Sequence, residues 1–233
     1  MKIKSVWGVW LLGLVMLPLF SLGVEETFLE ESKAQEEALK AKIGVSFCFD
    51  GDTVKLNDRR IVRISGIDTP ELAHDKQPEQ FYAKISKAHL EELLNGHKVS
   101  LENTSVNGKD RYGRIIADIL LEDGQSIAEL MVSHGAAFFY PHKDLLPDFQ
   151  ERLLTLQRNA IRERQGMWGP LLELPVAHQN FIGNKDSLRF FPADCPQAQK
   201  IKPRQRVYFG TLMDAFVAGF APARICLFWP PAK

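Results

Sequence analysis

The sequence lacks three features that often point to a function: net charge, abundant cysteine and histidine pairs at metal-ligand spacing. Its 233 residues include 29 basic and 29 acidic side chains, so the chain as a whole does not attract polyanions. It has only three cysteines, and its six histidines form no metal-spaced pair. Residues 171–233 carry a net charge of +4, from eight Lys and Arg against four Asp and Glu. Any attraction to nucleic acid must therefore come from this tail or from the local placement of charges.

A single long uncharged run lies at the N-terminus, from Val6 to Val24, behind two lysines. Small residues suited to cleavage after Gly23 predict a signal peptide at residues 1–23. The run is also long enough to span a membrane, so an uncleaved anchor at residues 5–24 remains open. Both interpretations place the rest of the chain outside the cytoplasm, either secreted, periplasmic or attached to the membrane. No cysteine follows the run, which argues against a bacterial lipoprotein.

The pattern of apolar residues predicts five strands and three helices after an acidic helical spacer at residues 24–42. We expect the strands at residues 43–49, 53–56, 61–64, 98–101 and 113–121, and the helices at residues 79–94, 127–134 and 146–165. A helix after the third of five strands is the order found in OB-type barrels. The pattern therefore favours a β-barrel with flanking helices.

Three short clusters of acids and arginines carry the chemistry of the chain. They are Asp50-Gly51-Asp52, then Arg63 with Asp68-Thr69-Pro70-Glu71, and Asp110-Arg111-Tyr112-Gly113-Arg114. Together they supply hard oxygen ligands, a spare carboxylate and guanidinium forks. These groups can bind a divalent cation and promote attack on a phosphodiester.

The order and spacing of the three clusters closely resemble the thermonuclease family, the staphylococcal nuclease-like enzymes. The resemblance covers about residues 43–169. It implies a five-stranded OB barrel flanked by three helices, which is an α+β fold. It also implies that Asp52 and Asp68 coordinate Ca²⁺ together with the backbone carbonyl of Thr69, and that Glu71 is the base that activates water.

The same resemblance assigns the substrate contacts. Arg63 and Arg114 correspond to the two arginines that bind the phosphate and stabilise its developing charge. Arg111 and Tyr112 match positions that hold the flanking phosphate and stack near a base or sugar. Tyr140 is a further candidate aromatic at the nucleotide pocket, on a looser match.

Residues 181–228, after a linker at residues 170–180, resemble a small metal-binding module that often follows such nuclease domains. Phe191 stands where the module has a ligating His, and Ala223 stands where it has the first Cys of the closing pair. Only Cys195 and Cys226 remain, and two ligands do not make a structural zinc site. We therefore expect a small α/β module without its metal, and we hypothesise a Cys195–Cys226 disulfide in its place, formed in an oxidising compartment.

These inferences predict an exported, calcium-dependent endonuclease that cuts DNA and RNA with little sequence preference. By resemblance, its products would end in a 3′-phosphate. We expect a monomer, and the sequence indicates no protein partner. The alternative is a nuclease-like protein without activity, kept as a nucleic-acid-binding or envelope scaffold protein.

Overall fold

The computed structural model describes residues 33, 37–74, 77–105, 108–226 and 228–232. The chain forms two units, residues 1–38 and residues 39–233, and only the second is described further. The expected signal peptide or anchor and most of the acidic spacer lie outside the described residues. Within those residues, no helix combines the length and the apolar character needed to cross a membrane.

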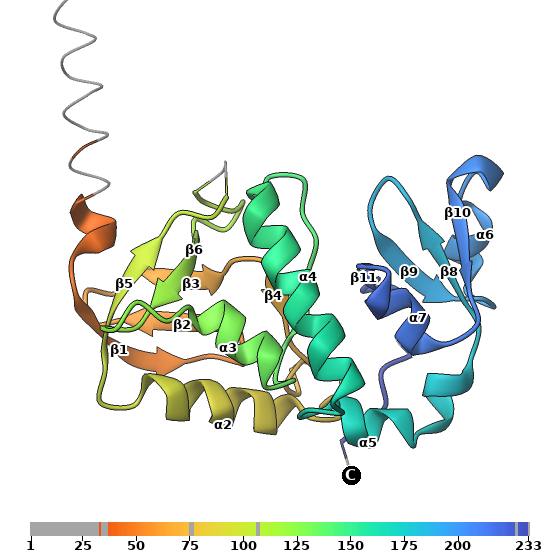
Figure 1. The fold of residues 1–233 in the computed structure, drawn as a ribbon, viewed down its shortest axis with the longest axis horizontal. Coiled ribbons are helices and arrows are strands. Elements are labelled where there is room, and N and C mark those ends of the chain that lie inside the picture. The colour runs from red at the N-terminus through yellow and green to blue at the C-terminus, as the bar shows by residue number, and fades with distance from the viewer. Residues whose placement is uncertain (1–32, 34–36, 75–76, 106–107, 227, 233) are drawn as a thin grey trace, which may run out of the picture. The chain divides into compact units, whose positions relative to one another are not determined.

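Five strands close into a barrel in the order β1-β2-β3-β6-β5 (Figure 1). They are β1 (Ile43–Cys48), β2 (Thr53–Leu56), β3 (Ile61–Ile64), β5 (Lys98–Glu102) and β6 (Ile115–Leu120). Strands β3 and β6 are parallel, and the other neighbours are antiparallel. The predicted five-stranded barrel is confirmed, because alternate apolar residues such as Val54, Val62 and Val99 turn inward and are fully buried.

Three helices pack around the barrel: α2 (Ala83–Leu94), α3 (Ile127–Ser133) and α4 (Pro147–Arg162). The short strands β4 (Ile67–Asp68) and β7 (Phe138–Phe139) pair with each other outside the barrel, and the sequence pattern did not reveal them.

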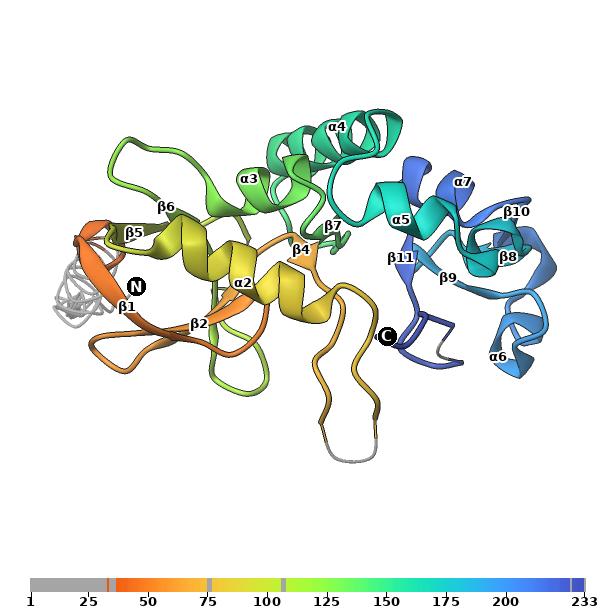
Figure 2. The same cartoon turned by 90° about the horizontal axis from the view of Figure 1, so that it is seen from below.

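Helix α2 begins four residues later than predicted, because the residues before it pair with the C-terminal end of the chain. The amide of Phe81 donates to the carbonyl of Pro230 at 2.7 Å, and the amide of Ala232 donates to the carbonyl of Glu79 at 2.8 Å. Figure 2 shows this end of the chain beside the base of the loop that precedes α2. The backbone before Ala83 is thus used for tertiary pairing and not for a helix.

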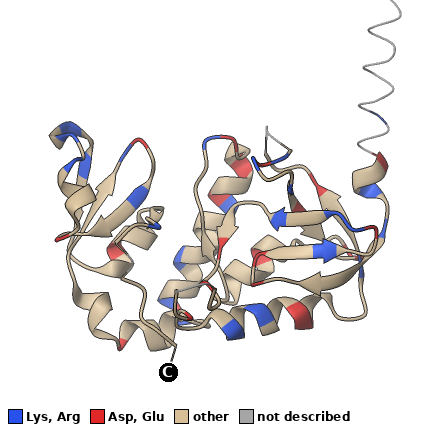
Figure 3. Cartoon of the chain, turned by 180° about the vertical axis from the view of Figure 1, so that it is seen from behind, with Lys and Arg blue, Asp and Glu red and all other residues tan. Residues whose placement is uncertain are grey.

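The C-terminal module is a four-stranded sheet in the order β10-β8-β9-β11, with β11 parallel to β9. Its elements are α5 (Trp168–Leu172), the 3₁₀ helix η1 (Pro175–His178), β8 (Phe181–Asn184), β9 (Arg189–Pro192), α6 (Pro196–Gln199), the 3₁₀ helix η2 (Pro203–Gln205), β10 (Arg206–Phe209), α7 (Leu212–Val217) and β11 (Ala221–Pro222). Residues 170–180, expected as a linker, contain the end of α5 and the whole of η1. Lys and Arg gather around α6, in keeping with the positive charge of this tail (Figure 3).

Helix α4 joins the barrel to the module (Figure 1). The fully buried side chain of Gln157 on α4 accepts a hydrogen bond from the amide of Phe139 at 2.8 Å and donates to the carbonyl of Phe216 on α7 at 2.7 Å. Around it, Phe216 packs against the rings of Phe138 and Trp168, with ring centroids 5.5 and 4.9 Å away. A shared apolar core and a buried polar link thus hold the module to the barrel.

Cys195 and Cys226 form a disulfide with their Cα atoms 5.9 Å apart. Phe191 packs against the small apolar cluster that includes Cys195. Cys48 is a buried free thiol, and burial raises its pKa to about 11. The module is therefore cross-linked by a covalent bond between Cys195 and Cys226.

Candidate active site

Two buried carboxylates form the centre of the site. Asp52 lies in the turn before β2, where its amide donates to Oδ1 of Asp50 at 3.0 Å, and Asp68 ends β4. Both are about 5% exposed. Burial raises the pKa of each carboxyl to about 6, and their mutual repulsion adds to this rise for Asp68, while the nearby Arg63 guanidinium opposes it. The pair therefore holds negative charge at neutral pH at an electrostatic cost that a cation would relieve.

Arg63 lies between these carboxylates. It projects from β3, where it pairs with Thr53 of β2 and with Ile116 of β6. Its Nη1 donates to the carbonyl oxygens of Ile64 and Ile67 at 3.1 and 2.8 Å. Its Nη2 lies 2.7 Å from Oδ1 of Asp68 and 3.0 Å from Oδ2 of Asp52. One nitrogen is thus anchored to the backbone while the other faces the carboxylates, so the guanidinium is fixed before any substrate arrives.

Thr69 and Glu71 follow Asp68 on the same loop. Thr69 is buried, and its hydroxyl donates to Oδ2 of Asp52 at 3.4 Å. The amide of Glu71 donates to Oε1 of Gln80 at 2.9 Å, and its carbonyl accepts from the amide of Gln80 at the same distance. These bonds fix the backbone of Glu71 while leaving its side chain 38% exposed beside the carboxylate pair.

Arg114, Arg111 and Tyr112 lie together in the turn before β6. Oδ1 of Asp110 accepts from the amides of Tyr112 and Arg114, and its Oδ2 lies 2.7 Å from Nε of Arg114. Arg111 stacks on the ring of Tyr112 at 4.7 Å from its centroid. Within the described residues Arg114 is therefore paired with Asp110, and it does not contact Asp52 or Asp68. Arg114 lies directly before β6, next to β3, because the residue that follows it, Ile115, pairs with Val62 of β3.

Tyr140 follows β7, and its amide donates to the carbonyl of Gly66 at 2.8 Å. The guanidinium of Arg189 stacks over its ring at 3.7 Å from the centroid, and Nη2 of Arg189 donates to the carbonyl of Pro141 at 3.0 Å. The structure thus covers this aromatic with an arginine from the C-terminal module.

Arg224, which follows β11 in the C-terminal module, also belongs to the site, although no pattern in the sequence pointed to it. Its Nη2 lies 3.2 and 3.3 Å from the two carboxylate oxygens of Asp68 and 3.6 Å from Oε1 of Glu71. The charge of Asp68, together with that of Glu71, raises the pKa of Arg224. Asp68 and Arg224 are 156 positions apart in the sequence, so no local pattern could bring them together.

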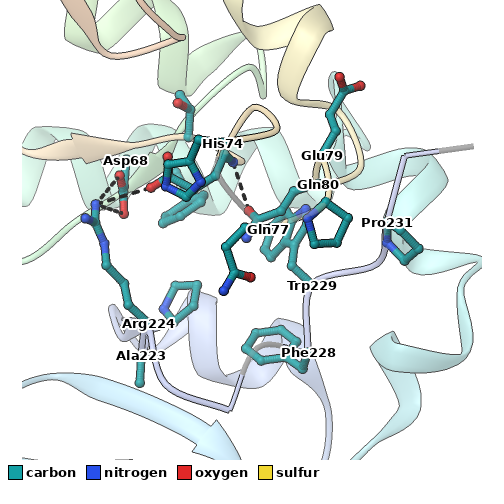
Figure 4. A pocket seen from close by; sticks show the side chains of 15 residues that line it. Asp68, His74, Gln77, Glu79, Gln80, Ala223, Arg224, Phe228, Trp229 and Pro231 are labelled. Atoms are coloured by element: carbon teal, nitrogen blue, oxygen red, sulfur yellow. Dashed lines mark hydrogen bonds and ion pairs between the residues drawn. The ribbon is translucent and has the colours of Figure 1, made fainter.

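A cavity of about 530 Å³ opens beside this cluster. Asp68, Glu71 and Arg224 line it together with Phe228 and Trp229. Figure 4 shows Asp68 and Arg224 on one side of the space and Phe228 and Trp229 on the other. Asp52 and Arg63 do not line it. Of the two buried carboxylates, only Asp68 therefore borders the cavity.

The donor set fits a hard cation with water among its ligands. Asp52 and Asp68 supply carboxylate oxygens, which Ca²⁺ and Mg²⁺ prefer. The described part of the chain contains no group of three or more His, Cys, Asp and Glu side chains placed to hold an ion. Other ligands would have to be water and backbone carbonyls, in line with the expected role of the Thr69 carbonyl.

Comparison with known proteins decides the family. A family model described as "Staphylococcal nuclease homologue" matches residues 61–170. The thermonuclease of Staphylococcus hyicus is 31% identical over 143 residues, which are 59% of this chain and 79% of that protein. The chain belongs to the staphylococcal nuclease family.

Two further relatives carry the same kind of name. An uncharacterized endonuclease of Escherichia coli is 30% identical over 54% of this chain and 76% of its own length. The probable endonuclease LCL3 of Komagataella phaffii is 30% identical over 49% of this chain, which spans about half of that protein, 52%. These relatives indicate a hydrolase of the nuclease type.

Proposed function

We propose that this chain is an exported, calcium-dependent endonuclease that hydrolyses the phosphodiester bonds of DNA and RNA. One observation carries the proposal: the anchored guanidinium of Arg63 lies between two buried carboxylates, Asp52 and Asp68. This arrangement places cation ligands and a phosphate-binding fork within about 3 Å of each other.

Asp52, Asp68 and the carbonyl of Thr69 would hold the calcium ion, which when bound supplies a Lewis acid that polarises a phosphoryl oxygen. Nη2 of Arg63 donates to a second phosphoryl oxygen, and its hydrogen bond strengthens as negative charge develops on the phosphate. Because Nη1 is already bonded to two carbonyls, little side-chain entropy is lost when the phosphate binds.

Glu71 is the proposed base. Its carboxylate takes a proton from the attacking water, whose oxygen forms a bond to phosphorus as the bond to the 5′-oxygen breaks, and that oxygen takes a proton from a solvent water. The products are a 3′-phosphate and a 5′-hydroxyl. Arg114 is the proposed second phosphate ligand, and to act so it must leave Asp110, which holds it at 2.7 Å.

Arg111, Tyr112 and Tyr140 are the proposed contacts to the flanking strand. Tyr112 is 69% exposed, and its ring, with Arg111 and Arg114 at 4.7 and 5.6 Å from the centroid, is the proposed stacking surface. Phosphate contacts and stacking do not read base edges, so little sequence preference is expected. Export is supported by the composition of residues 1–23 and by the Cys195–Cys226 disulfide, which is typical of oxidising compartments.

The test is cleavage of single-stranded DNA and of RNA by the purified protein, with calcium and with excess chelator, followed by analysis of the product ends. Glu71→Gln should lower kcat by roughly 100- to 10,000-fold, since it removes the proton acceptor. Glu122→Gln, at an exposed turn, is the matched control. Cleavage that continues at the same rate in excess chelator, or products with 5′-phosphate ends, would refute the proposed chemistry. Tight binding of nucleic acid without any cleavage would favour the binding-protein alternative.

A further inference from the structure

The last residues of the chain are fastened to the loop that precedes α2. Three hydrogen bonds hold them there. They run from the Phe81 amide to the Pro230 carbonyl at 2.7 Å, from the Ala232 amide to the Glu79 carbonyl at 2.8 Å, and from Nε1 of Trp229 to the Phe81 carbonyl at 2.9 Å. On the other side of this segment, the Cys195–Cys226 disulfide ties it to the module. Before Arg224, the amide of Ala223 donates to the carbonyl of Phe190 at 2.9 Å, and the disulfide at Cys226 follows two residues after it, so Arg224 is held beside the active site from both sides.

Arg224 extends the charged cluster from Asp68 to Glu71. Arg63 contacts both Asp52 and Asp68, whereas Arg224 contacts Asp68 and Glu71. The two guanidiniums thus approach Asp68 together, each through its Nη2 atom. The side chain of Arg224 is 63% exposed, so that a bound strand can reach it, whereas that of Arg63 is 13% exposed.

The charge balance of the cluster favours a phosphate at Arg224 when a cation is present. The three carboxylates of Asp52, Asp68 and Glu71 outnumber the two guanidiniums of Arg63 and Arg224. A divalent cation reverses this balance, and the cluster then attracts anions. A carboxylate that ligates a cation also has fewer lone pairs for arginine, which leaves the donors of Arg224 available to phosphate.

The cavity beside Arg224 has the walls of a base-binding site. Phe138, Phe228 and Trp229 contribute aromatic rings, and Gln77 and His74 contribute polar groups. Figure 4 shows the side chains of Gln77, Arg224 and Phe228 around a common space. Its volume of about 530 Å³ lies within the range of small-molecule sites. Aromatic walls accept bases of any identity, because every base presents a π-face.

We propose that Arg224 and this cavity form a flanking subsite for a single-stranded polynucleotide. Arg224 binds the phosphate next to the one that is cleaved, and the cavity receives the base of the nucleotide beyond it. A base can enter such a cavity only when it is unstacked and unpaired, so the subsite selects single strands over duplexes. The inference rests on the proposed nuclease function, and it makes the C-terminal module part of the substrate site.

The test compares two substrates in the presence of calcium. One is a single-stranded oligonucleotide, and the other is a dinucleotide, which has a cleavable phosphodiester but no flanking phosphate. Arg224→Ala should raise KM for the oligonucleotide roughly tenfold, because a charge-assisted hydrogen bond is lost. The same variant should lower kcat/KM for the dinucleotide by a clearly smaller factor, a loss that reflects only the contacts of Arg224 with Asp68 and Glu71. Gln77→Trp, which fills the cavity from an exposed loop position, should act in the same way.

Arg204→Ala is the matched control, since it removes an exposed arginine of the same module that does not line the cavity. An equal loss in this control would mean that only the charge of the module matters. A parallel loss on both substrates would place Arg224 at the cleaved phosphate. Faster cleavage by Arg224→Ala would make Arg224 a blocking group. An unchanged KM would mean that it has no role. Each of these four results overturns the proposal.

The experiment separates this inference from the proposed function. If the wild-type protein does not cleave either substrate, the proposed function fails, and the subsite is then judged by binding. Fluorescence anisotropy with a labelled single strand and calcium should show weaker binding for Arg224→Ala and Gln77→Trp but not for Arg204→Ala. Equal dissociation constants for all four proteins would overturn the subsite.

Discussion

Replacing Asp118 with asparagine should stabilise the protein at neutral pH and leave its stability nearly unchanged in acid. Asp118 lies on β6 with no exposed surface. Its Oδ1 accepts from the amides of Ile119 at 2.8 Å and Ala128 at 3.1 Å, and an asparagine oxygen can accept both bonds. Burial nevertheless raises the pKa of this carboxyl to about 7, so the folded protein resists its ionisation.

The sign and size of this change in the free energy of unfolding follow from the linkage between proton binding and folding. A carboxyl whose pKa is higher in the folded state than in the unfolded chain contributes stability below the unfolded pKa, and this contribution is lost as pH rises through the folded pKa. The stabilising contribution of Asp118 is therefore lost between about pH 4 and pH 7. A rise from 3.8 to about 7 corresponds to roughly 4 kcal/mol when the group is fully ionised. The amide of the asparagine side chain does not titrate, so the variant avoids this cost, although its NH2 group replaces Oδ2, which has no hydrogen-bond partner among the described residues, and this lowers the net gain below about 4 kcal/mol.

The assay is urea unfolding at pH 4.5 and pH 8, with chelator present so that cation binding does not contribute. The Asp118→Asn variant should exceed the wild type by up to roughly 4 kcal/mol at pH 8 and by little at pH 4.5. Glu122→Gln, at an exposed side chain, should show no such difference. The reasoning is refuted if Asp118→Asn gains the same stability at both pH values or loses stability at pH 8.

Three further predictions concern the polar link, the disulfide and the cation. Gln157→Leu should lower the free energy of unfolding by about 2–4 kcal/mol in urea titrations, because two buried backbone groups lose their partners; an unchanged midpoint would contradict it. Changing Cys195 and Cys226 to serine should cost about 3–4 kcal/mol, since the bond closes a loop of 31 residues; unreduced, denatured wild type should show one free thiol, and three would exclude the bond. Calcium affinity, measured by calorimetry, should fall as pH drops below about 6, because Asp52 and Asp68 then bind protons instead; affinity independent of pH between 5 and 7 would show that these carboxylates do not bind the ion.

The barrel could be predicted because its signals are local. Alternating apolar residues place the strands at residues 53–56 and 61–64 without error, since one face of each is buried in the core. The errors arise where tertiary contacts override the local pattern. Residues 79–82 have helical periodicity, but their backbone pairs with residues 230–232. The paired strands β4 and β7 are two residues long, which is too short for any periodicity to show.

In the candidate site, too, residues that are close in the sequence could be predicted, whereas a residue placed by tertiary packing could not. Asp52, Arg63 and Asp68 could be grouped from the sequence, because they lie on or beside consecutive strands, and the structure places them in contact. Arg114 is paired in the structure with Asp110, four positions away in its own turn, and its role at the phosphate stays a prediction. Arg224 could not be found, because its position depends on how the whole C-terminal module packs against α4 and the loop before α2.

The most direct test of the central claim is cleavage of single-stranded DNA at saturating calcium by the wild-type protein and by Arg63→Ala. Arg63 is the side chain that joins both carboxylates to the proposed phosphate position. We expect cleavage by the wild type that chelator abolishes, and a loss of at least about 100-fold in kcat/KM for the variant, as is typical when a donor to the developing charge is removed. Folded wild-type protein that cuts nothing, or an Arg63→Ala variant that cuts as fast as the wild type, would contradict the account.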